Sequence, residues 1–309
     1  IIAKSESEFH SELLRAIGVD TVVEPARESA QRLAHTLGTR LADFATGSHS
    51  AFQHPHVKFI CVNVDGRDAY KLGALPIVAD AREALRALTR EAQAAGVAPN
   101  LAYLREVSAA KERWERQMRE EVHRQAPGEA MAQGQVIGVL NSEARPSDTV
   151  IAAAGTLPGD LLKLWDATGG AACHLEFGYS CMGYELPAGL GVRMARPQGE
   201  VYVFIGDGTY LLNPTELVTA MQENLKITVV ISENHGFQSI AQLQMGRVGR
   251  PFATEFRTRD PETNRLEGAY LKVNLAKNAE SLGARVWHVD TPESLRSALR
   301  EAREERRPR

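Results

Sequence analysis

Apolar and polar positions in the first hundred residues alternate with periods that predict strands followed by a helix. Residues 57–64 form an apolar, β-rich run that ends in an Asp-Gly turn, and residues 75–79 form a second short run. Asp80 and Glu83 then match the capping box that opens a helix, which we expect over 81–93. This part of the chain therefore reads as the end of an α/β domain.

Two further segments of the first half have a helical period. Residues 24–40 carry a helical rather than a strand-like pattern, and residues 101–124 predict a charged helix with a single apolar stripe. The stripe either binds a partner or lies on the surface between two domains, and we favour the surface helix. Its residues are Val107, Ala110, Trp114, Met118 and Val122.

The second half alternates more regularly between short apolar strands and helices. Strands that are apolar on both faces are typical of a parallel sheet covered by helices on each side. We expect strands over 150–154, 201–205, 227–232 and 284–289, and helices over 160–168, 183–194, 214–224, 276–283 and from Pro292.

Two of these helices carry features that predict how they pack. Gly189 and Gly191 indicate that the helix over 183–194 lies close against its neighbours. Leu217, Val218 and Met221 are expected to form the buried face of the next helix.

The whole pattern predicts an α/β protein with a doubly wound parallel sheet. At about 150 residues per domain, the 309 residues correspond to about two domains. We expect part of a Rossmann-like central domain over residues 1–100, a helical linker over 101–130 and a second sheet domain over 131–309.

Composition narrows the class of protein. With 36 basic and 39 acidic residues, the chain has no basic excess, so we expect no nucleic-acid partner. Its apolar runs are far shorter than the roughly 18 residues of a membrane span, so we expect no membrane partner either. Cys61, Cys173 and Cys181 form no CxxC pair and are odd in number, which predicts buried or half-buried thiols in a reducing, cytoplasmic location.

The chemistry centres on a Gly-Asp-Gly triplet that directly follows an apolar strand. Asp207 lies at the carboxyl end of that strand, and the next strand ends at Glu233-Asn234 with Gly236 just beyond. We expect a helix between the two strands, with Asn213 as its N-cap. Because a β-α-β crossover makes the strands parallel, Asp207 and Asn234 are expected to meet at one edge of the sheet.

Carboxylate and amide oxygens are suited to Mg²⁺ or Ca²⁺, which completes its coordination with phosphate oxygens and water. Gly206 and Gly208 would let backbone N–H groups approach those phosphates. The residues alone thus predict a site for a metal and a diphosphate.

This arrangement resembles the thiamine diphosphate-binding fold. The resemblance implies that Asp207, Asn234 and the backbone carbonyl of Gly236 hold the metal, Mg²⁺. That family usually has Asn-Asn where this chain has Glu233-Asn234. The metal-ligand position is therefore kept, and the residue before it differs.

A second resemblance lies upstream, in GYSCMGYELPAGLG. It implies that Met182 wedges between the two rings of the cofactor and that the carbonyl of Ser180 accepts a hydrogen bond from the aminopyrimidine. A third match, AAAGTLPGD, places Gly155, Thr156 and Leu157 near the diphosphate. The expected cofactor-binding residues are Gly155, Thr156, Leu157, Ser180, Met182, Gly206, Asp207, Gly208, Thr209, Asn234 and Gly236.

Several longer segments resemble one branch of this family, the trihydroxycyclohexane-dione hydrolases. They are AAAGTLPGDLLKLW, HLEFGYSCMGYEL, ENHGFQSI, LADFATGSHSAF and VNVDGRDAYKLGALPIVADA. The resemblance implies thiamine diphosphate- and Mg²⁺-dependent hydrolytic cleavage of a C–C bond in a cyclic 1,2-diketone, giving 5-deoxyglucuronate in myo-inositol catabolism. His174 and His235 lie near the matched motifs and are candidates for proton transfer, although a structural role is the interpretation we favour.

The resemblance also implies a part that this sequence does not match. Enzymes of the family have an N-terminal pyrimidine domain, whose Glu activates the cofactor, and the active site forms between two subunits. We therefore expect this chain to be a fragment that is inactive alone. The full-length protein would be a homodimer or homotetramer in which the pyrimidine domain of a second subunit completes the site.

Three alternatives remain. A carboligase of the acetolactate synthase type would share the cofactor, the metal ligands and Met182. A non-catalytic or split cofactor-binding subunit would also lack the activating Glu. A dinucleotide-binding domain is disfavoured because no strand is followed by GxGxxG.

Overall fold

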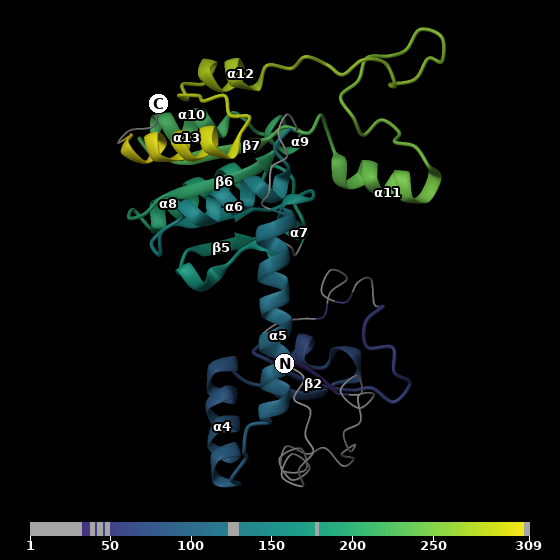
Figure 1. Cartoon of the computed structure of the whole chain (residues 1–309), viewed down its shortest axis with the longest axis vertical. Coiled ribbons are helices and arrows are strands. Elements are labelled where there is room, and N and C mark those ends of the chain that lie inside the picture. The colour runs from purple at the N-terminus through teal and green to yellow at the C-terminus, as the bar shows by residue number, and fades with distance from the viewer. Residues whose placement is uncertain are drawn as a thin grey trace. The chain divides into compact units, whose positions relative to one another are not determined.

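The computed structural model describes residues 33–37, 41, 46, 50–122, 130–176 and 179–305. The chain divides into two compact units, Ile1–Glu112 and Arg113–Arg309, and each contains a parallel sheet (Figure 1). The division falls inside helix α5 (Leu101–Gln117), within the segment predicted as a linker. The α/β class and the parallel sheets predicted from the sequence are confirmed.

The first unit contains a three-stranded parallel sheet in the order β1-β2-β3. Asp80 caps α4 as predicted, since its carboxylate accepts hydrogen bonds from the backbone N–H groups of Arg82 and Glu83. The Glu83 side chain accepts instead from Arg86. The elements are β1 (Leu33–Leu37), β2 (Lys58–Asn63), α3 (Gly66–Ala69), the 3₁₀ turn η2 (Lys71–Gly73), β3 (Leu75–Val78) and α4 (Ala81–Ala94).

The helical pattern predicted over residues 24–40 is wrong for the part that the structure describes. Residues Leu33–Leu37 form β1 and pair in parallel with β2. Long-range pairing to a buried strand outweighs a local helical period, because tertiary context overrides weak intrinsic preference. The rest of that segment lies outside the described residues, as do residues 123–129 of the predicted linker and much of the LADFATGSHSAF match.

The second unit contains a four-stranded, fully parallel sheet in the order β5-β4-β6-β7. Its strands are β4 (Thr149–Ala152), β5 (Ala172–Leu175), β6 (Val201–Gly206) and β7 (Thr228–Ser232). Its helices are the π-helix η3 (Met118–Val122), α6 (Gln133–Glu143), α7 (Leu157–Leu164), the 3₁₀ turn η4 (Ala167–Gly169), α8 (Glu185–Ala195), α9 (Asp207–Tyr210), α10 (Glu216–Gln222), α11 (Gln238–Val248), α12 (Leu275–Ser281) and α13 (Pro292–Glu304).

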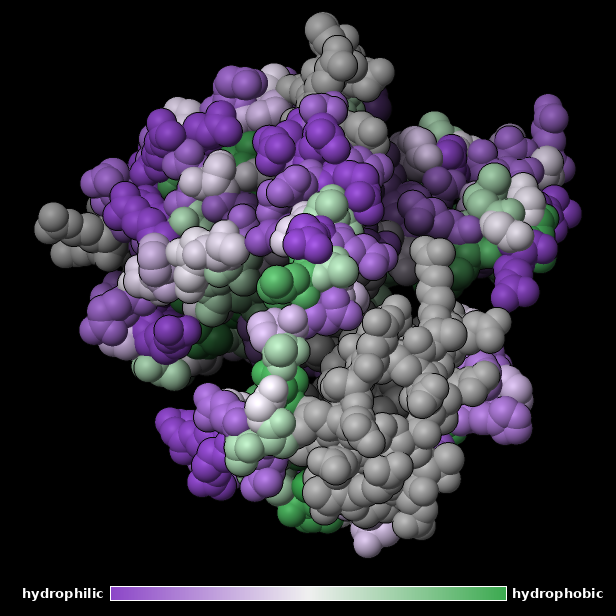
Figure 2. All heavy atoms as spheres, turned by 60° about the horizontal axis from the view of Figure 1, so that its bottom comes forward, coloured by the Kyte–Doolittle hydropathy of each residue, from purple (hydrophilic) through white to green (hydrophobic). Residues whose placement is uncertain are grey.

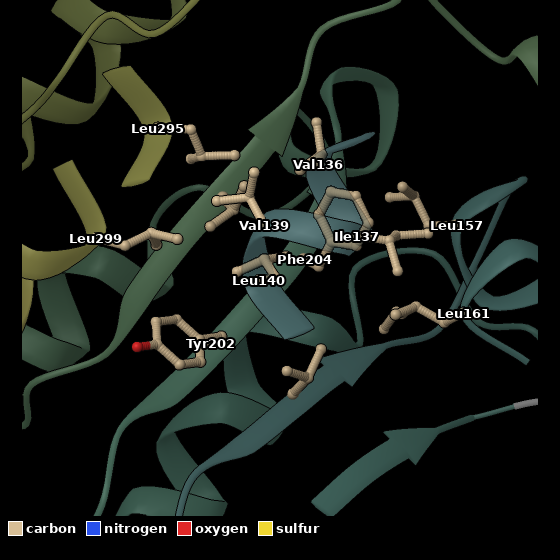
Figure 3. Packing of buried hydrophobic residues seen from close by; sticks show 13 residues of the cluster. Val136, Ile137, Val139, Leu140, Leu157, Leu161, Tyr202, Phe204, Leu295 and Leu299 are labelled. Carbon is tan, nitrogen blue, oxygen red and sulfur yellow. The ribbon is translucent and has the colours of Figure 1, made fainter. Parts of the chain in front are cut away.

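Two apolar cores lie on opposite faces of this sheet, as a doubly wound fold requires. Side chains alternate along β6, so Tyr202 and Phe204 pack with α6, α7 and α13, whereas Val203 and Ile205 pack with α8, α10 and α12. Figure 3 shows the first core, in which Ile137 and Phe204 are fully buried between helix and sheet. Because β6 is buried on both faces, the residues at its end are held rigidly.

Several predicted boundaries need correction. Helix α7 begins at Leu157 rather than Asp160, because Pro158 is accommodated in the first turn, where a missing N–H costs nothing. The helix predicted over 214–224 is α10, which begins at Glu216, and the extra turn α9 follows the Gly-Asp-Gly triplet. Residues 284–289 form no strand, although Val286 and Val289 pack against the two cores.

Two packing predictions were only half correct. Gly189 is buried against β6, since an added Cβ would lie 2.5 Å from Val203 Cγ2, but Gly191 faces open space. Leu217 is buried, whereas Val218 and Met221 are each 40% exposed, because α10 is shorter than predicted and turns a narrower face to the core.

On the face that Figure 2 shows, the coloured residues are mostly hydrophilic, with apolar side chains in small patches. Val107 and Trp114 of the α5 stripe are exposed, whereas Met118 is buried. None of the helices in the described ranges combines the length and apolarity that a membrane crossing needs. The three cysteines are free; Cys61 is buried and Cys173 half-buried as predicted, whereas Cys181 is exposed because it lies in the loop before α8.

Candidate functional site

The predicted site residues follow the ends of four neighbouring strands. Because the strands are parallel, the segments after β4, β5, β6 and β7 all open at the carboxyl edge of one sheet. Residues 153–157 follow β4, and residues 176–184 follow β5 in the chain. Gly206 ends β6, residues 207–209 follow it in α9, and residues 234–236 follow β7. The topology therefore brings every predicted cofactor-binding segment to one edge.

Asp207 is the centre of the best-defined part of this edge. Its side chain is 2% exposed, and its Oδ2 atom accepts hydrogen bonds from the backbone N–H groups of Asn234 at 3.2 Å and His235 at 2.7 Å. Gly236 N lies 3.2 Å from the same oxygen, and Gly208 N donates to Oδ1 at 2.7 Å. The carboxylate thus ties the end of β6 to the turn after β7.

The turn after β7 depends on its unusual backbone. His235 has φ of 65° and Gly236 has φ of 137°, which directs successive N–H groups toward Asp207. A Cβ on Gly236 would lie 2.5 Å from Thr254 O, so no larger residue fits without a shift of backbone. Phe237 N in turn donates to Thr254 O at 2.8 Å.

The side chain of Asn234 completes the cluster. One end of its amide lies 3.2 Å from Asp207 Oδ1 and 2.9 Å from the carbonyl oxygen of Gly236. With the NH₂ group at that end, the amide donates to both oxygens. With its oxygen there, that atom lies 3.2 Å from Asp207 Oδ1 and 2.9 Å from Gly236 O, close to the spacing of about 3.0 Å between adjacent oxygen ligands around Mg²⁺. The structure therefore places the Asn234 amide beside both Asp207 Oδ1 and the Gly236 carbonyl, and these oxygen donors are of the kind that suits a hard cation.

This donor set is poor in charged groups. Among the described residues, no group of three or more His, Cys, Asp and Glu side chains is placed to hold a metal ion. One carboxylate, one amide and one carbonyl suit a hard cation that takes further oxygens from phosphate and water. The chemistry of the donors thus agrees with a metal-diphosphate site rather than a zinc site.

The two glycines of the triplet and the threonine that follows it have different surroundings. A Cβ on Gly206 would meet nothing within 4 Å, so its backbone is open to a ligand. The N–H of Gly208 is donated to Asp207, and a Cβ on Gly208 would lie 2.8 Å from the ring of Phe237. Thr209, which follows the triplet, is buried.

The loop after β4 is suited to an anion through its backbone. Gly155 is exposed with φ of 87°, and α7 begins two residues later, so the first N–H groups of that helix point to the loop. Thr156 Oγ1 donates to Gln133 Oε1 at 3.1 Å. Leu157 is buried in the apolar core, so its side chain is not exposed to a ligand.

The segment after β5 presents Met182 to solvent, with 41% of its side chain exposed. Ser180 adopts φ of 53°, and its hydroxyl donates to Ala153 O at 3.4 Å, which links the segment to the end of β4. Glu176 supports the same segment, since its carboxylate accepts the N–H groups of Tyr179 at 2.9 Å and Cys181 at 3.0 Å.

A buried acid, Glu185, lies directly behind this segment. The residue is 0% exposed, and Oε1 accepts the N–H of Ala154 at 3.1 Å. Burial raises the pKa of the Glu185 carboxyl, and neighbouring backbone N–H groups only partly offset that rise.

The two candidate histidines have different surroundings. The Nε2 atom of His174 lies 2.8 Å from the hydroxyl of Tyr184 in an exposed pair. The ring of His235 stacks on Tyr270 at 4.5 Å between centroids, and Arg257 lies over the same tyrosine at 3.7 Å. Both histidines are exposed, so either ring is accessible for proton transfer.

Sequence reasoning missed four of these residues, namely Gln133, Glu176, Tyr184 and Glu185. The spacing of Glu176 from the N–H groups that it accepts, three and five residues later, was a local signal that could have been used. Gln133 and Glu185 act across 23 and 31 residues, so no local pattern identifies them.

Comparison with known proteins agrees with this geometry. Residues 153–309 match the C-terminal TPP-binding domain of thiamine pyrophosphate enzymes. The chain is similar to 3D-(3,5/4)-trihydroxycyclohexane-1,2-dione hydrolase 2 of Bacillus cereus (strain ZK / E33L), with 39% identity over 292 residues. It is 38% identical over 293 residues to hydrolase 1 of that strain and to the hydrolase of Bacillus anthracis (strain A0248). Each alignment covers 87% of this chain but 45% of the relative, so the chain spans less than half the length of these proteins.

Proposed function

The chain belongs to the thiamine pyrophosphate enzyme family, and from that premise we propose that it binds thiamine diphosphate through Mg²⁺ at the carboxyl edge of its second sheet. The observation that carries the proposal is the convergence of Asp207, the Asn234 amide and the Gly236 carbonyl. These groups would hold Mg²⁺, and the ion would hold the diphosphate. The exposed Gly155 turn and the start of α7 would donate backbone N–H groups to the same diphosphate.

The ring end of the cofactor would lie on the segment after β5. Met182 is exposed there and would support the bent arrangement of the two rings, while the Ser180 carbonyl would accept from the aminopyrimidine. Gly206 and Gly208 would line the diphosphate end, together with Thr209. The proposed cofactor site therefore uses all four strand ends.

For the reaction, we propose hydrolytic cleavage of a C–C bond in trihydroxycyclohexane-1,2-dione, giving 5-deoxyglucuronate in cytoplasmic inositol catabolism. The similarity over 87% of the chain to proteins named as hydrolases of this dione supports the proposal. Bound thiamine diphosphate supplies a carbon nucleophile that attacks a carbonyl group. His174, whose ring contacts the Tyr184 hydroxyl, is the residue that we propose to move protons at this site.

The activity belongs to a longer assembly in this proposal. A pyrimidine domain from a second subunit would supply the activating Glu, in a homodimer or homotetramer. The 309-residue chain alone would then bind the cofactor but turn over little substrate. Steady turnover of the dione by the purified chain alone would contradict this part of the proposal.

Calorimetric titration of the 309-residue chain with thiamine diphosphate, with and without Mg²⁺, tests the binding site. We expect Mg²⁺-dependent binding that is lost in Asp207→Ala and retained in Glu223→Ala, which removes an exposed carboxylate just after α10. Binding that survives in Asp207→Ala would overturn the assignment of the metal site. Circular dichroism of each variant shows whether a loss of binding reflects unfolding.

A product assay distinguishes the hydrolase from a carboligase. The dione should be consumed with release of a carboxylic acid by a complex that contains this chain and a pyrimidine domain. Condensation of two 2-keto acids by that complex, without hydrolysis of the dione, would favour the acetolactate synthase type. Absence of both activities in a complex that binds the cofactor would favour a non-catalytic subunit.

A further inference from the structure

Glu185 lies where two segments of the proposed cofactor site meet. It is the first residue of α8, and its side chain reaches back to the end of β4, where Oε1 accepts the N–H of Ala154 at 3.1 Å. Ala154 directly precedes Gly155, and Glu185 follows Met182 by three residues. A single carboxyl group thus connects the diphosphate-side loop with the ring-side segment.

The burial of this carboxyl group is unusual for a helix N-terminus. An acid in the first turn is favoured by the helix dipole, but such residues ordinarily remain in contact with water. Glu185 is instead 0% exposed, and Leu186 and Ala153 beside it are also buried. Dipole stabilisation alone therefore does not account for its position.

The second oxygen of the Glu185 carboxyl group is in an unfavourable environment. Oε2 is buried and has no hydrogen-bond partner among the described residues. A buried acceptor without a partner is destabilising, so a carboxyl group is unfavourable at a site where an apolar side chain would fit. Burial also raises the pKa of this group, which favours the neutral acid.

A second bond joins the same two segments. The hydroxyl of Ser180 donates to Ala153 O at 3.4 Å, longer than the bond made by Glu185. The loop after β4 and the segment before α8 follow two different strands, β4 and β5. The Glu185 bond is the shorter of these two cross-connections.

We propose that Glu185 is a positioning residue of the proposed cofactor site. Its carboxyl group fixes the Ser180–Gly183 segment against the loop after β4. This inference rests on the proposed function, because it assigns the two segments to the two ends of thiamine diphosphate. The residue sets the distance between the groups that contact the diphosphate and those that contact the rings.

This role makes a prediction that depends on the ligand. Thiamine diphosphate touches both segments and is sensitive to the distance between them. Inorganic pyrophosphate with Mg²⁺ occupies only the diphosphate end, formed by the loop after β4 and the Asp207 cluster. Loss of the Glu185 hydrogen bond should therefore weaken the binding of thiamine diphosphate and leave the binding of pyrophosphate unchanged.

The test is calorimetric titration of the 309-residue chain with each ligand in the presence of Mg²⁺. Glu185→Met keeps the volume of the side chain but removes its acceptor, and Glu185→Gln keeps both shape and acceptor. We expect Glu185→Met to raise the Kd of thiamine diphosphate about tenfold or more and to leave the Kd of pyrophosphate within about twofold. Glu185→Gln should bind both ligands like the wild type, as should the surface control Glu223→Met.

The outcomes separate the possible explanations. The positioning role would be overturned if Glu185→Met bound both ligands as tightly as the wild type, or if it bound both ligands more weakly by the same factor. It would also be overturned if Glu185→Gln bound thiamine diphosphate as weakly as Glu185→Met. If Glu185→Met loses its circular dichroism spectrum, Glu185→Asp replaces it, because the shorter acid cannot reach Ala154 and carries the same expectation. Absence of binding of either ligand by the folded wild-type chain would overturn the proposed function and this inference with it.

Discussion

Two glycines on α8 provide a direct measure of how tightly the helix packs on the strand that carries Asp207. A Cβ on Gly189 would lie 2.5 Å from Val203 Cγ2, about 1 Å closer than an ordinary carbon contact. Val203 is fully buried on β6 and cannot turn away, since β-branched side chains are restricted at χ1. A Cβ on Gly191 would meet nothing within 4 Å.

The magnitudes follow from these contacts. Replacing Gly by Ala inside a helix stabilises the folded state by about 0.5–1 kcal/mol, and this gain applies equally to both positions. Overpacking at Gly189→Ala costs about 1–3 kcal/mol. We therefore expect Gly191→Ala to be more stable than wild type, and Gly189→Ala to be less stable than Gly191→Ala by about 1–3 kcal/mol.

Urea unfolding followed by far-ultraviolet circular dichroism measures both free energies of unfolding. Because the helix-propensity gain cancels between the variants, their difference reports the packing of α8 on β6 alone. Equal stability of the two variants would refute the packing described here. Gly189→Ala should also weaken Mg²⁺-dependent cofactor binding, because a shift of β6 displaces Asp207.

Three further predictions concern charged groups and the metal site. The folded-state pKa of Glu185 is raised above its ordinary value of 4.5, so its contribution to stability is complete below that pH and is lost as the pH rises through the folded-state value. Urea unfolding at successive pH values should therefore show that the free energy of unfolding of the wild type falls relative to that of Glu185→Gln. The fall should be up to about 1.4 kcal/mol per pH unit between pH 4.5 and the folded-state pKa, and parallel pH curves for the two proteins would contradict this. Asp148→Asn should lower the free energy of unfolding by about 3 kcal/mol in the same assay, because it breaks the buried 2.7 Å ion pair with Arg303. The control is Asp65→Asn, which removes an exposed ion pair, and an equally small loss of stability in both variants would contradict the prediction. Asn234→Ala should lower the affinity for Mg²⁺-thiamine diphosphate with little change in stability, and unchanged affinity in calorimetry would remove Asn234 from the metal site.

The sequence by itself was sufficient for the features that depend on local order along the chain. Strand β6, the triplet at its end and Asn234 after β7 could be placed because a parallel β-α-β unit always brings consecutive carboxyl ends to one edge. The cap of α4 at Asp80 and the start of α13 at Pro292 were predicted for the same reason, since capping depends on neighbouring residues.

Only the tertiary structure decided the features that depend on distant partners. Residues 33–37 became a strand because β2 offered a parallel edge, and residues 284–289 remained outside the sheet although their pattern is that of a strand. Which of Gly189 and Gly191 touches β6, and the burial of Glu185 against Ala154, depend on contacts with elements far along the chain. The free energy of such contacts comes from burial and hydrogen bonding between segments, which a local pattern of residues does not encode.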